Sequence, residues 1–244
     1  MTEELFRNDA TLRECSATVL TLCEGGVILD RTVFYPLGGG QAGDAGELLL
    51  ADGRRVAITE ARKSKEHPGA VLHLLAPDTD LSWLAPGMAV TAQIDWARRR
   101  CHMRFHTTTH LLCALVPYPV DGCSITAGYA RLDFHMVEPL DKEALTAGIA
   151  RLVAEAHPVR HRWISEAELD ANPGLVRSMS VQPPRGLGRV RVLEIDGVDL
   201  QPCGGTHVAN TAEIGAIVVT KVEKKSAMTR RVVLGFAEPA AGRS

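Results

Sequence analysis

Two pairs of potential metal ligands stand out in this sequence of 244 residues, and the members of each pair are four residues apart. His106 and His110 lie in a segment that we expect to be helical, where this spacing points both imidazoles to the same side. Cys203 and His207 enclose two glycines, which allow a loop to approach a metal closely. One thiolate and three imidazoles are a typical donor set for tetrahedral zinc(II). The four residues together therefore predict one zinc ion per chain.

The helical pair alone has an equally good structural explanation, and the second pair is what favours zinc. A cysteine beside a histidine is also the pattern of a catalytic thiol, but that interpretation leaves His106 and His110 without a role. A zinc site with four firm ligands would be structural, whereas three firm ligands would leave a position for water or substrate. In the second case zinc would activate water or polarise a carbonyl group, which favours hydrolysis of an ester or amide.

Three threonines, Thr107, Thr108 and Thr109, separate the two helical histidines. Residues with β-branched side chains are mediocre helix formers, so local helix propensity does not explain this run. A hydroxyl-bearing surface beside the metal would explain it, and the backbone N–H groups of Gly204 and Gly205 would add donors. Such surroundings suit a polar substrate.

The elements that must position these groups are a helix and two strand-rich regions. We expect the helix to begin after Asp95, whose carboxylate can cap it, and to continue to about Val116. Before it, short apolar runs separated by glycine turns predict a small β-barrel. After it, an amphipathic helix over 141–157 lies among further strands. The expected strands cover 17–22, 26–29, 47–50, 55–60, 70–75 and 89–94 before the helix, and 124–125, 130–135, 159–164, 189–195, 214–222 and 231–236 after it.

This order of elements predicts an α+β fold in two domains. We expect a small β-barrel domain with a glycine-rich loop in residues 1–92, and an α+β two-layer, zinc-containing domain in residues 93–244. The glycine-rich loop, residues 38–46, has five glycines in nine residues. It lacks the Gly-Lys-Ser/Thr ending of a P-loop and the spacing of a dinucleotide fingerprint. Its composition alone is best explained by a tight corner of the barrel.

Composition limits the class of protein. The chain is 45% hydrophobic and 23% charged, as in ordinary globular proteins. No apolar run approaches the roughly 18 residues that a membrane helix needs, and the N-terminus lacks the basic and apolar parts of a signal peptide. We therefore expect a cytoplasmic protein without membrane association. The six cysteines are scattered along the chain, which argues against a disulfide scaffold.

Charge is informative only locally. The net charge of −2 provides no general attraction for nucleic acid. Basic residues nevertheless gather in two clusters, and these comprise Arg98, Arg99, Arg100 and Arg104 in the first, and Lys221, Lys224, Lys225, Arg230 and Arg231 in the second. Such clusters usually form solvated faces. Beside a candidate active site they would also suit a phosphate backbone.

Several of these motifs together carry a resemblance to a known family. The matching segments are 29–35 leading into the glycine-rich loop, 106–112, 130–134, 203–208 and 213–215. In this order they resemble the editing region of alanyl-tRNA synthetase and its free-standing relatives, the AlaX-type alanyl-tRNA editing proteins. The resemblance extends over most of the chain.

The resemblance implies a β-barrel followed by an α+β editing domain, and deacylation of tRNA(Ala) mischarged with serine or, as a second candidate, glycine. It assigns the metal positions to His106, His110, Cys203 and His207. It also implies an amino-acid pocket whose residues are Thr107, Thr108, Thr109, Gly38, Gly39, Gly40 and Gln41. The aminoacylation domain of the synthetase does not precede the barrel here, so we expect no ATP site and editing in trans.

Two other functions remain open at this stage. A non-catalytic tRNA-binding module with structural zinc would unfold when the metal is removed and would hydrolyse nothing. A metallohydrolase acting on another small acyl ester would not need tRNA. The sequence leaves open whether His207 is a direct ligand, whether zinc activates water or positions the substrate, and what the oligomeric state is.

Overall fold

The computed structural model describes residues 1–179, 182–183, 185–186 and 188–237. The chain divides into two compact units, Met1–Arg100 and Cys101–Ser244. It is a strand-rich α+β protein that includes a closed six-stranded barrel, which confirms the predicted fold class at this level. The predicted domain bounds, 1–92 and 93–244, remain a prediction. No helix among the described residues is long and apolar enough to cross a membrane.

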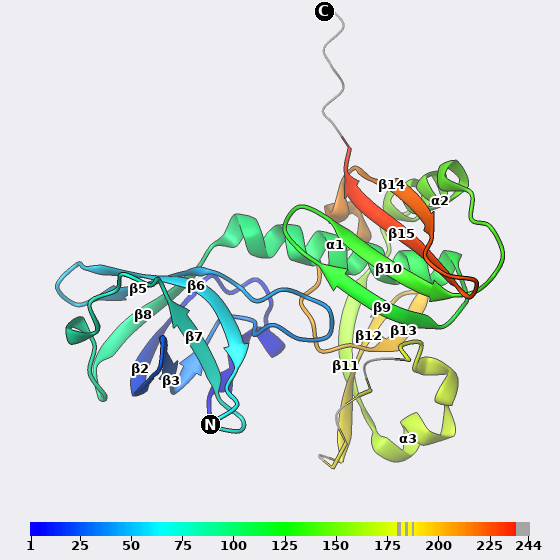
Figure 1. The fold of residues 1–244 in the computed structure, drawn as a ribbon. Coiled ribbons are helices and arrows are strands. Elements are labelled where there is room, and N and C mark those ends of the chain that lie inside the picture. The colour runs from blue at the N-terminus through cyan, green and yellow to red at the C-terminus, as the bar shows by residue number, and fades with distance from the viewer. Residues whose placement is uncertain (180–181, 184, 187, 238–244) are drawn as a thin grey trace, which may run out of the picture. The chain divides into compact units, whose positions relative to one another are not determined.

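The first unit is built on the closed barrel, with strands in the order β2-β3-β7-β6-β5-β8 (Figure 1). Every neighbouring pair is antiparallel. Alternate side chains point inward, and Val19, Leu29 and Leu48 are fully buried in the barrel core. The barrel strands are β2 (Glu14–Cys23), β3 (Gly26–Leu29), β5 (Gly46–Leu50), β6 (Arg55–Lys63), β7 (Val71–Leu75) and β8 (Ala89–Ile94), and beside them lie β1 (Glu3–Glu4), β4 (Arg31–Thr32) and the short 3-10 helices η1 (Leu5–Arg7) and η2 (Leu81–Trp83). All six barrel strands were expected from the sequence.

The glycine-rich loop contains a two-residue turn. The backbone N–H of Gly38 donates to the oxygen of Gln41 at 3.1 Å, and the N–H of Gln41 donates back to Gly38 at 3.0 Å. Between them Gly39 and Gly40 have φ values of 59° and 82°, in the left-handed region that favours glycine. Further along, a Cβ atom on Gly43 would lie 2.1 Å from a backbone oxygen of β6. Turn geometry and close backbone approach therefore explain these glycines.

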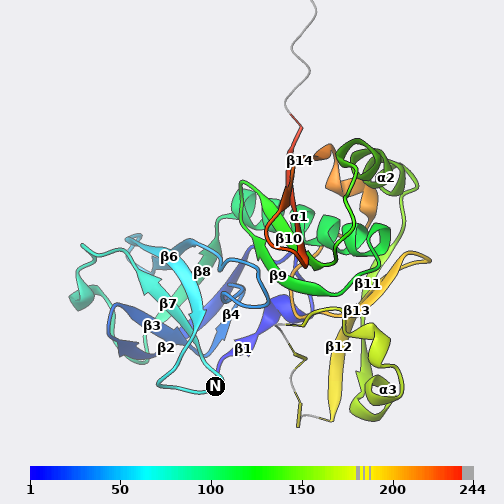
Figure 2. The same ribbon diagram turned by 45° about the vertical axis from the view of Figure 1, so that its right-hand side comes forward.

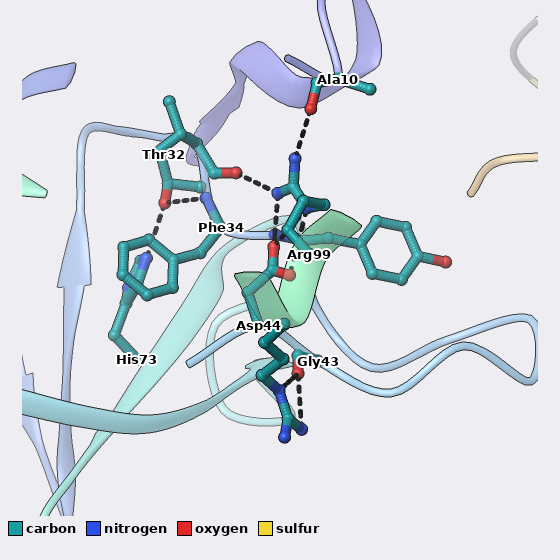
Figure 3. A network of polar contacts seen from close by, with 10 residues as sticks. Ala10, Thr32, Phe34, Gly43, Asp44, His73 and Arg99 are labelled. Carbon is teal, nitrogen blue, oxygen red and sulfur yellow. Dashed lines mark hydrogen bonds and ion pairs between the residues drawn. The ribbon is translucent and has the colours of Figure 1, made fainter. Parts of the chain in front are cut away.

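Arg99 and Asp44 form a buried ion pair at the base of this loop (Figure 3). Both side chains are at most 1% exposed, and Nε of Arg99 lies 3.1 and 3.0 Å from the two carboxylate oxygens. The same guanidinium donates to the backbone oxygens of Ala10 at 2.8 Å and Val33 at 2.6 Å. The carboxylate also accepts the N–H of Tyr35 at 2.6 Å. One arginine thus ties together three segments of the first unit.

The basic clusters are accordingly not simple solvated faces. Arg98 donates to a backbone oxygen of the glycine-rich loop, and Arg104 donates to the oxygen of Ile214 at 2.5 Å. In the second cluster, Arg231 donates two hydrogen bonds to the carboxylate of Asp133, at 2.6 and 2.8 Å. Several arginines of both clusters therefore serve internal contacts.

The longest helix, α1 (Trp96–Leu115), begins as predicted, because Asp95 Oδ1 accepts the N–H of Arg98 at 3.0 Å. The second unit contains a four-stranded antiparallel sheet in the order β14-β15-β10-β9. Its strands are β9 (Val120–Ile125), β10 (Ala130–His135), β14 (Ile217–Lys224) and β15 (Thr229–Phe236). Helix α2 (Lys142–Ala154), capped by Asp141, lies beside β14 in both views (Figures 1 and 2).

A three-stranded antiparallel sheet completes the second unit. Its strands are β11 (Val159–Ser165), β12 (Arg189–Ile195) and β13 (Asp199–Pro202), and the short helices nearby are α3 (Glu166–Ala171), η3 (Pro173–Leu175) and η4 (Thr211–Ile214). The order β11-β12-β13 makes β11 an edge strand. One face of this sheet packs through Ile164, Val190 and Val192 against Leu169 of α3. The opposite face carries Gln201 of β13, the strand that runs directly into Cys203 of the candidate site.

Candidate metal centre

The four predicted ligands come together in the second unit. One nitrogen from each of the three histidines and the sulfur of Cys203 all lie within 4.8 Å of one another. Sγ of Cys203 is 3.5 Å from Nε2 of His106 and 3.2 Å from Nε2 of His207. His106, His110 and His207 are at most 8% exposed. A sulfur and three nitrogens, converging in a buried place, fit a tetrahedral zinc ion.

Helix α1 supplies two of these groups for the reason expected from the sequence. The rings of His106 and His110 stack with their centroids 5.5 Å apart, as residues one helical turn apart on the same side should. The ring of His207 approaches from the other segment, 4.2 Å from His106 and 5.1 Å from His110. The helix and the loop thus contribute two donors each.

Thr107 fixes the orientation of His207. Its hydroxyl donates to the backbone oxygen of Met103 at 2.9 Å and accepts the N–H of Val208 at 3.2 Å. Nδ1 of His207 lies 3.3 Å from the same oxygen. Because the hydroxyl has one proton and gives it to Met103, Nδ1 must be the donor in this contact. Nε2 of His207 is then unprotonated and faces Cys203, which is the tautomer that a metal ligand requires.

His110 is oriented by a carboxylate. Its Nδ1 donates to Oδ2 of Asp199 at 2.8 Å, and the Asp199 side chain is 3% exposed. Gln201 in turn donates to both oxygens of that carboxylate, at 2.9 and 3.0 Å. A carboxylate behind a histidine fixes its tautomer and is a common second partner of metal-binding imidazoles. The other nitrogen, Nε2, is left for the metal.

Arg191 holds the loop that carries Cys203. Its guanidinium donates to the backbone oxygens of Cys203 at 2.8 Å and Gly205 at 3.2 Å. The N–H of Gly205 lies 3.4 Å from Sγ of Cys203, where it stabilises negative charge on the sulfur. These contacts tie the loop to strand β12.

The electrostatics suit metal binding. Burial raises the pKa of the Cys203 thiol, but the adjacent imidazoles of His106 and His207 lower it more, so that it lies well below its usual value. Burial lowers the pKa of His207 to about 3. A thiolate and a neutral imidazole are the forms that bind zinc. Burial also lowers the pKa of His110, but its hydrogen bonds to Asp199 and Cys203 raise it more, to about 10, so that a metal binding at Nε2 would displace a proton from this ring.

The three threonines do not have equivalent positions. At about 100° per residue, Thr107 and Thr109 flank the side of α1 that carries the histidines, whereas Thr108 lies about 160° from each ligand. All three are buried, and the hydroxyls of Thr108 and Thr109 donate to the helix oxygens of Arg104 and His106 at 2.8 and 2.7 Å. The remaining predicted pocket residues, Gly38, Gly39, Gly40 and Gln41, lie in the first unit, and their part in a pocket stays a prediction.

Asp199, Gln201 and Arg191 were not predicted as part of the site. Asp199, Gln201 and Cys203 alternate along the chain, so on a strand they would share one face. That period of two was the available signal. It is carried by β13 (Asp199–Pro202), a short segment whose Asp, Gln and Pro residues have low strand propensity.

Two segments of the chain match known protein families. Residues 6–98 match the family described as tRNA synthetases class II (A), and residues 190–233 match the Threonyl and Alanyl tRNA synthetase second additional domain. The second match includes Cys203 and His207 and begins in β12.

Similar proteins cover nearly the whole chain. The alanyl-tRNA editing protein AlaX-M of Methanosarcina mazei is 33% identical over 253 residues, which is 99% of either protein. AlaX-M of Saccharolobus solfataricus is 34% identical and covers 95% of this chain and 98% of its own length. The alanine–tRNA ligase of Pyrococcus furiosus is 33% identical over 98% of this chain but only 26% of the ligase. The motifs that suggested the resemblance are thus supported along the whole sequence, and the chain belongs to the family of AlaX-type alanyl-tRNA editing proteins.

Proposed function

We propose that this protein hydrolyses, in trans, the ester of tRNA(Ala) mischarged with serine, using one zinc ion held by His106, His110, Cys203 and His207. Membership of the AlaX family makes the chain an aminoacyl-tRNA deacylase, and therefore an enzyme, as predicted. The choice of serine, the acceptance of glycine and the use of zinc are the proposed parts.

The observation that carries the proposal is the convergence of four donor atoms within 4.8 Å in a family that edits alanyl-tRNA. Zinc held there would supply Lewis-acid chemistry, either activation of a water molecule or polarisation of the ester carbonyl. The chain's own residues prepare the donors. Thr107 presents the unprotonated nitrogen of His207, Asp199 holds Nδ1 of His110 so that Nε2 faces the other donors, and Gly205 supports the thiolate of Cys203.

Selection of the amino acid requires a small polar pocket beside the donors. We propose Thr107 and Thr109, on the flanks of the ligand side of α1, as residues of this pocket. Thr108 was predicted for the same role, but its place on the opposite side of the helix gives that role less support. The turn from Gly38 to Gln41 is proposed to complete the pocket on the basis of the family resemblance.

The alternatives have become weaker. A non-catalytic tRNA-binding module is disfavoured because the relatives covering the chain carry the name of editing proteins. A hydrolase of another small acyl ester would bear the same zinc site, so only substrate comparison can exclude it. Glycine remains the second candidate amino acid, because nothing in the described pocket residues distinguishes a missing side chain from a hydroxymethyl group.

Deacylation of purified Ser-tRNA(Ala), Gly-tRNA(Ala) and Ala-tRNA(Ala) tests the proposal, with the free serine ester as a control. We expect rapid loss of serine, with Ala-tRNA(Ala) spared and the free ester hydrolysed far more slowly. Equal rates on the free ester and on Ser-tRNA(Ala) would contradict an editing function. Hydrolysis of Gly-tRNA(Ala) with Ser-tRNA(Ala) spared would correct the proposed substrate.

A further inference from the structure

The sheet face that leads to Cys203 continues outward across two more strands. The N–H of Cys203 donates to the backbone oxygen of Arg191 at 3.1 Å, so Cys203 extends the pairing between β13 and β12. On the next strand Arg191 is paired with Trp163 of β11. Directly paired residues of antiparallel strands project to the same side of a sheet. Cys203, Arg191 and Trp163 therefore form one row that runs from the metal centre to the edge strand.

This row changes from buried to exposed. Arg191 is 7% exposed and holds the ligand loop, whereas Trp163 at the edge is 42% exposed. His161 lies two residues before Trp163 on β11, and Arg189 lies two residues before Arg191 on β12. Both therefore project to the same side of the sheet as the row, and both are exposed. We refer to His161, Trp163 and Arg189 as the edge strip.

Arg189 carries the charge of the edge strip and lies against its tryptophan. The Arg189 guanidinium lies over the Trp163 ring, 4.7 Å from its centroid. Within the ranges that the structure describes, no carboxylate comes within 4.0 Å of Arg189. Arg162, on the other face of β11, is by contrast near both Glu168 and Glu194, at 3.5 Å each. An exposed indole beside an unneutralised arginine is the combination that binds single-stranded nucleic acid, through base stacking and phosphate contact.

We propose that the edge strip binds the single-stranded 3′ end of the tRNA, at the nucleotides that precede the one bearing the aminoacyl ester. The inference rests on the proposed function, since the ester must lie at the metal centre. Two strand spacings separate the Cys203 and Trp163 backbones by about 10 Å, a distance that a neighbouring nucleotide can span. Trp163 stacks on a base, and Arg189 contacts a phosphate. The row through Arg191 connects this surface to the ligand loop.

Kinetics on two substrates test the assignment. Ser-tRNA(Ala) carries the preceding nucleotides, whereas 3′-O-seryl-adenosine keeps the ester and terminal nucleoside but lacks them. Trp163→Ala should lower kcat/KM for Ser-tRNA(Ala) by about 10-fold to 100-fold, as loss of one stacking contact does. It should leave kcat/KM for seryl-adenosine unchanged, and Trp163→Phe should retain most of the activity on tRNA. An equal loss on both substrates would mean that Trp163 acts only through the ligand loop, and would overturn the proposal.

Arg189→Ala separates the charge from the stacking. The kcat/KM of this variant for Ser-tRNA(Ala) should fall. The slope of log kcat/KM against log salt concentration should become shallower by about one unit, which corresponds to the loss of one phosphate contact. Arg160→Ala removes the same charge from the opposite face of β11, where the side chain is also exposed. This matched control should keep the wild-type slope. The same change of slope in both variants would show a general charge effect instead of a defined contact.

A binding measurement keeps this inference distinct from the proposed function. The chain has three tryptophans, and we expect the oligoribonucleotide 5′-ACCA to quench a part of the fluorescence that Trp163→Phe removes. Quenching without any deacylation would support the edge strip and contradict the function. Deacylation of Ser-tRNA(Ala) with unchanged kinetics in Trp163→Ala would support the function and overturn the edge strip. Fluorescence of Trp163 that responds to protein concentration but not to RNA would identify a contact between two copies of the chain, and would also overturn it.

Discussion

Nδ1 of His110 lies 2.8 Å from Oδ2 of Asp199, a carboxylate that is itself held by two hydrogen bonds from Gln201. This relationship links a candidate metal ligand on helix α1 to a strand almost ninety residues later, and it determines which nitrogen of His110 would be available to a metal. The site is thus defined by contacts behind the ligands as much as by the ligands.

Asp199→Asn should weaken zinc binding about 10-fold to 100-fold, which is the usual effect of removing the partner of a ligating histidine. The asparagine can still accept the proton of Nδ1 but no longer offers a negative charge. Competition with a chromophoric chelator measures the affinity. Asp196→Asn, which removes an exposed carboxylate from the turn before β13, is the control and should bind zinc normally. Wild-type affinity in Asp199→Asn would show that this contact does not support the metal.

Thr107→Val should weaken zinc binding and destabilise the fold by about 1–3 kcal/mol. The reason is that the backbone N–H of Val208 and the ring Nδ1–H of His207 lose a buried acceptor. Thr107→Ser keeps the hydroxyl and should retain most of both properties. Thr108→Val is the matched control, since its hydroxyl donates to the backbone oxygen of Arg104 on the other side of α1. Urea unfolding with and without zinc gives the two numbers. If Thr107→Val and Thr108→Val lose zinc affinity equally, the assigned tautomer of His207 is wrong.

Asp44→Asn should destabilise the protein by about 3–5 kcal/mol, because it leaves the fully buried Arg99 without its counter-charge. Glu3→Gln disrupts the exposed pair with Arg31, whose two side chains are 58% and 49% exposed, and should change the free energy of unfolding by less than about 1 kcal/mol. Urea unfolding of the two variants compares them directly. Similar small effects in both would show that the buried pair contributes little to the stability of the first unit.

His73 should make the protein less stable in mild acid. It is fully buried in the first unit, where Nδ1 donates to Val27 at 3.2 Å and Nε2 accepts the hydroxyl of Thr32 at 2.8 Å (Figure 3). The Val27 carbonyl can only accept, so Nδ1 carries the proton of the neutral ring and Nε2 accepts from Thr32, whose oxygen also accepts the N–H of Phe34. The neutral ring is therefore satisfied, and burial lowers its pKa from 6.5 to about 4.

The sign follows from which state binds the proton. Between pH 6.5 and about 4 the unfolded chain protonates this histidine and the folded chain does not, so the free energy of unfolding falls as the pH falls. The full effect is about 3 kcal/mol, reached below pH 4 and absent above pH 6.5. His73→Gln is less stable overall but should lose this part of the pH dependence. An unchanged slope between pH 4 and 6.5 in the variant would contradict the assignment.

Much of the fold was predictable because its elements have strong local signals. The barrel strands are short apolar runs between glycine turns, and α1 begins at a capping aspartate. The burial of Arg99 beside Asp44 was not predictable, because three consecutive arginines look alike in sequence. Only the fold determines which of them forms the buried ion pair.

At the candidate site, the sequence pointed to the four potential donors but not to the residues behind them. Equal spacing of two donor pairs identified His106, His110, Cys203 and His207, and the structure brings these residues together. Asp199 and Arg191 act through tertiary contacts that depend on the register of β12 and β13, and short polar strands have weak propensity signals. The run of threonines predicted a polar lining, which stays a prediction, and the contact of the Thr107 hydroxyl with Nδ1 of His207 could be seen only in the structure.

Zinc-dependent hydrolysis is tested by the zinc content and Ser-tRNA(Ala) deacylation rate of the wild-type protein and of Cys203→Ala, measured on the same preparations. We expect one zinc ion per wild-type chain, loss of activity on chelation and recovery when zinc is returned. Cys203→Ala should stay folded, as circular dichroism would show, but bind zinc weakly and lose at least about 100-fold in rate. A folded, verified metal-free protein that deacylates Ser-tRNA(Ala) at the wild-type rate would contradict a role of zinc in the reaction.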